Sequence, residues 1–142
     1  MSAKRIHHEA LEVALIDYWV GLRSRTCVVA PETTFRLSGD TFLEPDSVVY
    51  PRASRLKSLS RSNVLLADSS LGYDRGRKAA LYASFGVREL WVIDAVKRAT
   101  RVFRKPSAEG YGETLDFGES DLLTPEFAPP EFALRLDELE SL

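Results

Sequence analysis

Apolar residues near the start of the chain recur at spacings of three and four. Over residues 4–22 this spacing places the large side chains on a single helical face. The residues on that face are His8, Leu11, Leu15, Tyr18, Trp19 and Leu22. The pattern predicts an N-terminal amphipathic helix whose apolar face packs against a core.

Shorter apolar runs follow, and they predict strands. Residues 26–30 and 34–37 form two such runs, and a turn at residues 38–40 leads into a third over residues 42–50. Period-two alternation in the third run places Glu44 and Asp46 on one face, together with Phe42, Val48 and Tyr50. Pro45 also suits an edge strand whose polar side meets water. The two carboxylates therefore belong either to a solvated edge or to a site.

The second half of the chain alternates strand and helix patterns. Residues 64–66 predict a strand and residues 68–70 a turn, and a helix is expected over residues 73–85, ended by Gly86. Strands are expected at residues 90–93 and 100–103, and the proline-punctuated C-terminal part is expected to wrap the domain. This order predicts an α/β fold with a mixed β-sheet flanked by helices.

Composition narrows the class of protein. A length of 142 residues and a hydrophobic fraction of 44% fit one globular domain over residues 1–142. The chain shows no apolar run of membrane-spanning length and no secretory signal pattern, so we expect no membrane association and a cytoplasmic location. Cys27 is the only cysteine, which excludes an internal disulfide and a thiolate-cluster metal site.

Charge is sorted along the chain although the formal net charge is only −2. Residues 51–105 contain 13 Lys or Arg and 4 Asp or Glu, whereas residues 106–142 contain 1 and 10. A basic segment of this kind can provide a surface for a phosphate backbone. Alternatively, the basic middle and the acidic end neutralise each other on one surface.

Lys78 lies on the apolar stripe of the second predicted helix, together with Asp74, Leu81, Tyr82 and Phe85. An ammonium group among apolar neighbours requires a partner or access to water. Asp74, one turn earlier, could pair with it as the side chain extends to the surface. Otherwise Lys78 lies beside another anion in a cleft.

Two segments together resemble a known family. The run FLEPDSVVY and the block ADSSLGYDRGRKAALYASFGVRELWVID are similar to the signature blocks of the bacterial Uma-two family, a branch of the PD-(D/E)XK nuclease superfamily. The resemblance covers residues 5–140 and includes His8, the Pro45-Asp46 pair and Tyr82. It implies a restriction-endonuclease-like core and metal-assisted hydrolysis of DNA by an endonuclease.

The resemblance also implies roles for individual residues. Asp46 would be the first ligand of Mg²⁺ or Mn²⁺, and Lys78 would be the catalytic lysine. The second acid of the family is missing: either Leu65 replaces a glutamate, or about four residues that carried it are deleted. Glu44 and Asp68 are the candidate substitutes as metal ligands, although Asp68 also suits the turn that follows it. Tyr82 is expected in the core or behind the site.

Two hypotheses follow from this incomplete site. The first is a metal-dependent endonuclease with Asp46 and Lys78 in the roles above. The second is an inactive remnant of the nuclease fold that binds nucleic acid or a protein partner through its basic middle segment. The resemblance also suggests a domain shortened at its N-terminus, and the oligomeric state, including a homodimer, stays open.

Overall fold

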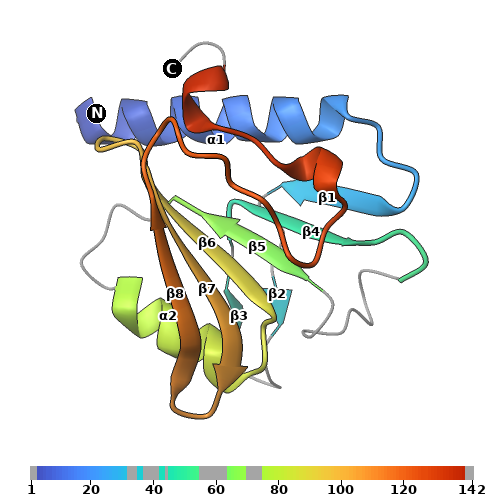
Figure 1. Cartoon of the computed structure of the whole chain (residues 1–142), viewed down its shortest axis with the longest axis vertical. Coiled ribbons are helices and arrows are strands. Elements are labelled where there is room, and N and C mark those ends of the chain that lie inside the picture. The colour runs from blue at the N-terminus through green and yellow to red at the C-terminus, as the bar shows by residue number, and fades with distance from the viewer. Residues whose placement is uncertain are drawn as a thin grey trace.

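The computed structural model describes residues 3–31, 35–36, 42–43, 45–54, 64–69 and 75–139 (Figure 1). Two α-helices and eight strands make up these segments, followed by two short 3-10 helices near the C-terminus. The helices are α1 (Ala3–Gly21) and α2 (Arg75–Ser84). The strands are β1 (Cys27–Pro31), β2 (Phe35–Arg36), β3 (Phe42–Leu43), β4 (Ser47–Pro51), β5 (Leu65–Asp68), β6 (Glu89–Asp94), β7 (Ala99–Ser107) and β8 (Gly110–Phe117). The 3-10 helices are Pro130–Phe132 and Leu136–Glu138.

Six of the strands form one mixed sheet in the order β1-β4-β5-β6-β7-β8. Strands β5 and β6 are parallel and are connected through α2, whereas every other neighbouring pair is antiparallel. Strands β2 and β3 pair separately as a small antiparallel sheet. The predicted α/β architecture, a mixed sheet flanked by helices, is confirmed.

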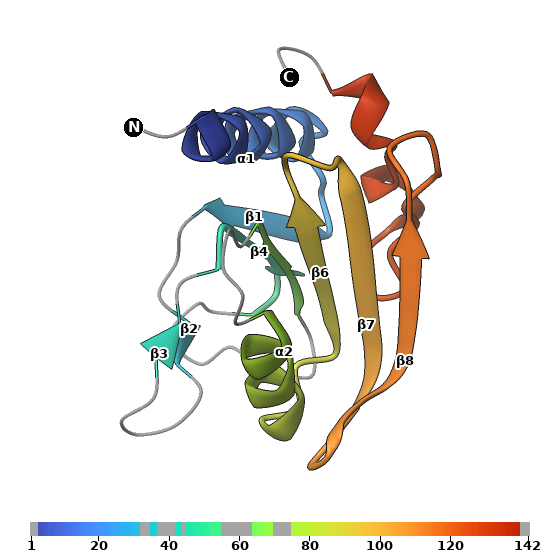
Figure 2. The ribbon, with the colours of Figure 1, turned by 90° about the vertical axis from the view of Figure 1, so that its left-hand side faces the viewer.

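Helices α1 and α2 pack on opposite sides of the sheet (Figure 2), and apolar side chains are buried on both of its faces. Helix α1 contributes Leu11, Leu15 and Trp19 to a cluster that also includes C-terminal side chains such as Phe132. Helix α2 contributes Ala79 and Tyr82 to a second cluster on the other face. The predicted amphipathic character of α1 is confirmed, and Tyr18 lies at the exposed margin of its apolar face.

The run at residues 42–50 is not one strand, which corrects the alternation prediction. It divides into β3, which belongs to the small sheet, and β4, which belongs to the large one. The break falls at Pro45 and Asp46, where the backbone bends. Proline has no N–H to give to a ladder, which favours a break at this point. Glu44 lies outside the described residues.

Gly86 caps the end of helix α2, as predicted. This glycine has a φ of 81°, a conformation that side chains with a Cβ rarely adopt. Its N–H donates to the carbonyl of Ala83, and the Val87 N–H donates to the carbonyl of Tyr82. These two bonds form a Schellman cap, which turns the chain directly into β6.

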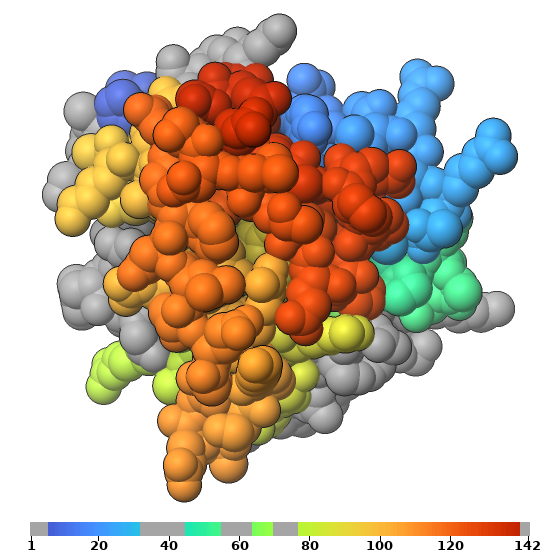
Figure 3. All heavy atoms as spheres, in the orientation of Figure 1, coloured from blue at the N-terminus to red at the C-terminus, as the bar shows by residue number. Residues whose placement is uncertain are grey.

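Strand β8 was not predicted, whereas the wrapping of the C-terminal part was. Residues 118–139 cross the front of the molecule in the view of Figure 3. They bury Leu123, Ala128, Leu134 and Leu136 in the cluster to which α1 also contributes. The indole Nε1 of Trp19 donates to the carbonyl of Phe132 at 3.0 Å.

Among the described residues, neither α-helix combines the length and the hydropathy that a membrane-spanning helix requires.

The basic middle and the acidic end of the chain pair with each other. Arg98 contacts Glu119 at 2.9 Å, and Arg101 contacts Asp116 at 2.7 Å. Strand β7 continues the pattern: Arg104 lies 3.9 Å from both Glu113 and Glu126, and Lys105 lies 3.5 Å from Glu113. This arrangement supports mutual neutralisation for these four residues, which lie in the last part of the basic segment.

A fully buried carboxylate holds the C-terminal segment to the sheet. Glu89, with a side-chain exposure of 0%, accepts hydrogen bonds from the indole of Trp91 and from the guanidinium of Arg104. It also accepts from the backbone N–H groups of Glu126 and Phe127. Because these donors come from three separate segments, one side chain fixes β6, β7 and the C-terminal segment to one another.

Candidate active site

Asp46 is held in one orientation by the end of the neighbouring strand. Its Oδ2 atom accepts a hydrogen bond from the backbone N–H of Ser69 at 2.7 Å and another from the Ser69 hydroxyl. Antiparallel pairing of β4 with β5 brings the two residues together, since Ser47 lies opposite Ala67. The Oδ1 atom of Asp46 faces helix α1, where it lies 4.0 Å from His8 Nε2.

His8 is oriented by the same serine. Its Nδ1 atom lies 2.8 Å from Ser69 Oγ. When the Ser69 hydroxyl donates its proton to Asp46, the serine oxygen is left to accept a hydrogen bond from the Nδ1–H of His8. In a neutral imidazole the Nε2 atom then carries a lone pair, and that lone pair points toward the acids of the site.

Glu12 completes a cluster of three metal-binding side chains. One turn after His8 on α1, its Oε2 atom lies 3.8 Å from His8 Nε2. One ligand atom each from His8, Glu12 and Asp46 lies within 4.8 Å of the others. Two atoms bound to one cation at about 2.1 Å lie at most about 4.2 Å apart, so small side-chain movements would close the cluster around an ion.

The chemistry of the cluster fits a hard divalent cation. Two carboxylates and an imidazole nitrogen face one another, and a positive charge between them, either a proton on His8 Nε2 or a bound cation, relieves the repulsion of the two acids. A cavity of about 10 Å³ borders Glu12, Asp46 and Ser47 beneath α1. Ser47 Oγ is fully buried there and has no hydrogen-bond partner among the described residues. This oxygen would accommodate one more polar group beside the ion.

Asp68 and Lys78 form a second part of the site. The ammonium of Lys78, with a side-chain exposure of 37%, lies 3.6 Å from Asp68 Oδ2. Burial raises the pKa of the Asp68 carboxyl above its usual range, outweighing the lowering by Lys78, and the nearby charge of Asp46 raises it further. Asp46, Asp68 and Lys78 therefore come together in one polar region.

This raised pKa has a consequence for stability. The Asp68 carboxyl holds its proton more tightly in the folded protein than in the unfolded chain. The free energy of unfolding therefore falls as the pH rises from about 3.9, the ordinary pKa of an aspartate, through the raised pKa of the folded state. We expect Asp68→Asn to have a higher urea midpoint than the unmodified protein at pH 7, with a difference that shrinks toward pH 4. An unchanged or lower midpoint at pH 7 would contradict this expectation.

The structure places the other predicted residues as follows. Glu44 and Asp74 lie outside the described residues. Leu65, which replaces the second acid in one of the two alternatives given above, has an exposure of 0% and packs in the α1-side cluster. Leu65 pairs with Val49, which lies three residues after Asp46 in the chain, so Leu65 is not the residue beside Asp46. Tyr82 is buried in the α2-side cluster behind the site, where burial raises its pKa.

Sequence reasoning missed Glu12 and Ser69. Glu12 follows His8 by four residues, and that spacing puts both side chains on the same face of a helix. The spacing was therefore a usable signal for Glu12. Ser69 offered no comparable signal, because its two roles depend on the pairing of β4 with β5 and on the position of α1.

Comparisons with known proteins agree with the fold and show the family of the chain. A crystal structure titled as that of "a putative nuclease belonging to DUF820 from Anabaena variabilis ATCC 29413" shares the fold, with a TM-score of 0.63 and 22% sequence identity, covering 95% of this chain and 80% of that one. No curated protein matches the chain significantly. The model of the Uma2 family, described as "Putative restriction endonuclease", matches residues 1–137. Because this match spans nearly the whole chain, the protein belongs to the Uma2 family.

Proposed function

We propose that the protein is a metal-dependent endonuclease that hydrolyses phosphodiester bonds in DNA. The observation that carries the proposal is the convergence of His8, Glu12 and Asp46 on one point next to the Asp68–Lys78 pair. The description of the family and the fold shared with the DUF820 protein support the same class of activity. In this proposal Glu12, from helix α1, takes the place of the acid that is missing from β5.

His8, Glu12 and Asp46 would hold Mg²⁺ or Mn²⁺. When bound, such an ion would polarise the scissile phosphate and lower the pKa of a bound water. Ser69 holds Asp46 Oδ2 and contacts His8 Nδ1, which would leave Asp46 Oδ1 and His8 Nε2 available to an ion. A partner that fixes a ligand in this way typically contributes about 10- to 100-fold to metal affinity.

Lys78 would contact the substrate itself. Its ammonium is partly exposed and is held by Asp68, so it can approach a phosphate without a change in the helix. A fixed positive charge of this kind stabilises the negative charge that develops on the phosphate oxygens. We therefore assign Asp68 to the orientation of Lys78 and not to the ion.

The alternative function, an inactive fold that binds a partner through its basic middle segment, has less support. Arg98, Arg101, Arg104 and Lys105 each lie within 4 Å of an acidic residue in the C-terminal part. Salt-dependent DNA affinity without cleavage would favour this alternative.

The direct test is cleavage of supercoiled plasmid with Mg²⁺ or Mn²⁺, and with chelator in place of metal. We expect the unmodified protein to cut only with metal, and we expect Asp46→Ala and Lys78→Ala each to reduce the rate at least about a hundredfold. Circular dichroism should show that both variants remain folded. Equal cleavage by all three proteins would refute the proposal.

A further inference from the structure

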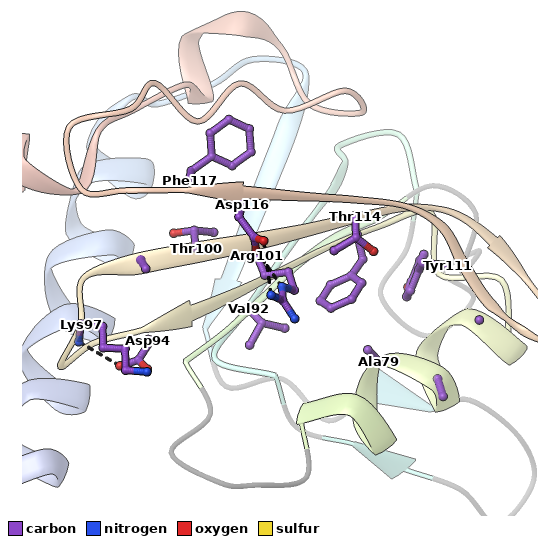
Figure 4. A pocket seen from close by; sticks show the side chains of 14 residues that line it. Ala79, Val92, Asp94, Lys97, Thr100, Arg101, Tyr111, Thr114, Asp116 and Phe117 are labelled. Atoms are coloured by element: carbon purple, nitrogen blue, oxygen red, sulfur yellow. Dashed lines mark hydrogen bonds and ion pairs between the residues drawn. The ribbon is translucent and has the colours of Figure 1, made fainter.

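A large cavity lies beside the candidate site, between helix α2 and the β6–β8 part of the sheet (Figure 4). Its volume is about 570 Å³, within the range of roughly 300–1,000 Å³ that is usual for ligand pockets. The side chains of Val92, Arg101, Thr114 and Tyr111 point toward α2, whereas Phe117 points to the other side of the sheet (Figure 4). None of these residues has a role in the site described above.

One row of the sheet connects the cavity to the candidate site. Asp68 lies beside Val92 in the parallel pair, Val92 lies opposite Arg101, and Arg101 lies opposite Asp116. Neighbouring strands are about 4.8 Å apart, so Arg101 lies roughly 10 Å from Asp68 across two strands. That span corresponds to about three nucleotides at 3.4 Å each. On α2, Lys78 of the site is followed directly by Ala79 and Ala80 of the cavity.

The lining is suited to a flat, uncharged group with a polar edge. Phe103 and Tyr111 form an aromatic wall with ring centroids 5.5 Å apart, and the Tyr111 hydroxyl donates to the carbonyl of Val87 at 2.8 Å, which fixes its ring. The charged residues that line the cavity are Asp94, Lys97, Arg101 and Asp116, and their formal charges cancel. A cavity with no net charge does not favour a phosphate, whereas aromatic faces favour a base.

The polar edge is provided by Arg101 and Asp116. Arg101 donates from Nε to Asp116 Oδ1 at 2.7 Å and from a terminal nitrogen to Asp116 Oδ2 at 3.3 Å. Both side chains are largely exposed, so the pair can separate at low cost. Once separated, they offer donors and acceptors to the edge of a nucleobase.

We propose that this cavity binds one unstacked nucleobase of the substrate strand, within a few nucleotides of the phosphate that the candidate site would cleave. The inference rests on the proposed function, which supplies a nucleic-acid strand at Lys78. Stacking on Phe103 and Tyr111 provides affinity, and the Arg101–Asp116 pair contacts the base edge. The protein therefore prefers a strand whose base can leave the stack, as in single-stranded or locally opened DNA.

The test separates base binding from hydrolysis. Fluorescence anisotropy with chelator present measures the affinity for a short labelled single strand of DNA and for an abasic strand of the same length and charge. We expect the unmodified protein to bind the strand with bases about tenfold more tightly, since stacking on aromatic side chains has effects of this size. Equal affinity for the two strands would overturn the inference.

Two variants on α2 locate the effect. Ala80 is exposed and lines the cavity, so Ala80→Trp fills it from the helix surface and should remove the preference for bases. Ser84→Trp adds the same side chain at an exposed position of α2 outside the cavity lining and should keep the preference. A preference that survives in Ala80→Trp would also overturn the inference. Asp46→Ala should keep the preference for the strand with bases. A protein that fails to cleave DNA could therefore still show this preference, so the two proposals fail separately.

Discussion

Replacing Glu12 by glutamine is expected to weaken Mn²⁺ binding at least about a hundredfold and to reduce DNA cleavage at least about a thousandfold. The substitution preserves the shape of the side chain but removes one of the two negative charges that face His8 Nε2. Hard cations depend strongly on the number of charged oxygen ligands. Isothermal titration with Mn²⁺ measures the affinity, and plasmid cleavage measures the rate.

A matched control is available on the same helix. Glu9 is exposed and is not part of the cluster with Asp46, so Glu9→Gln makes the same change of charge away from the ligand atoms. We expect this variant to bind Mn²⁺ and to cleave DNA like the unmodified protein. If Glu12→Gln and Glu9→Gln behaved alike, Glu12 would not be the second acid of the site.

Truncating Glu89 to alanine is expected to destabilise the fold by about 3–5 kcal/mol. The change removes the acceptor for the guanidinium of Arg104, the Trp91 indole and two backbone N–H groups in a fully buried position. Arg104, with a side-chain exposure of only 14%, would lose its closest anion. A loss of this size is a large fraction of the stability of an ordinary domain, which is about 5–15 kcal/mol. Urea unfolding followed by tryptophan fluorescence measures the effect.

Two further variants help to interpret that measurement. Glu89→Gln keeps an acceptor oxygen, so it should lose less stability than Glu89→Ala and should remain measurable if the alanine variant does not fold. Glu126 lies 3.9 Å from Arg104 but has an exposed side chain, so Glu126→Ala should cost less than about 1 kcal/mol. A cost for Glu89→Ala as small as that for Glu126→Ala would show that the buried carboxylate is not the anchor of the C-terminal segment.

The elements with long or regular patterns were predictable from the sequence. Apolar spacing located α1, and the Gly86 cap located the end of α2. The break at Pro45 was not predicted, because alternation in a short run is the same whether its residues belong to one strand or to strands of two sheets. Strand β8 was missed because Gly110 and Gly112 weaken its pattern.

The candidate site was only partly predictable. Asp46 and Lys78 were named through resemblance, and the structure brings both of them close to Asp68. Glu12 reaches the site only because α1 crosses the sheet where β4 begins and β5 ends, and periodicity cannot specify that crossing. Ser69 depends on strand pairing in the same way. Local patterns identify which helical face is buried, but they do not identify what lies opposite the residues at its margin.

The contact between α1 and the C-terminal segment affects the order of events during protein synthesis. Helix α1 leaves the ribosome before residues 118–139, yet Trp19 packs against Phe132 with ring centroids 5.9 Å apart and donates to its carbonyl. Until residues 118–139 emerge, the helix that carries His8 and Glu12 lacks much of its packing surface. A nascent chain would therefore lack the full packing that positions His8 and Glu12 until residues 118–139 have been released.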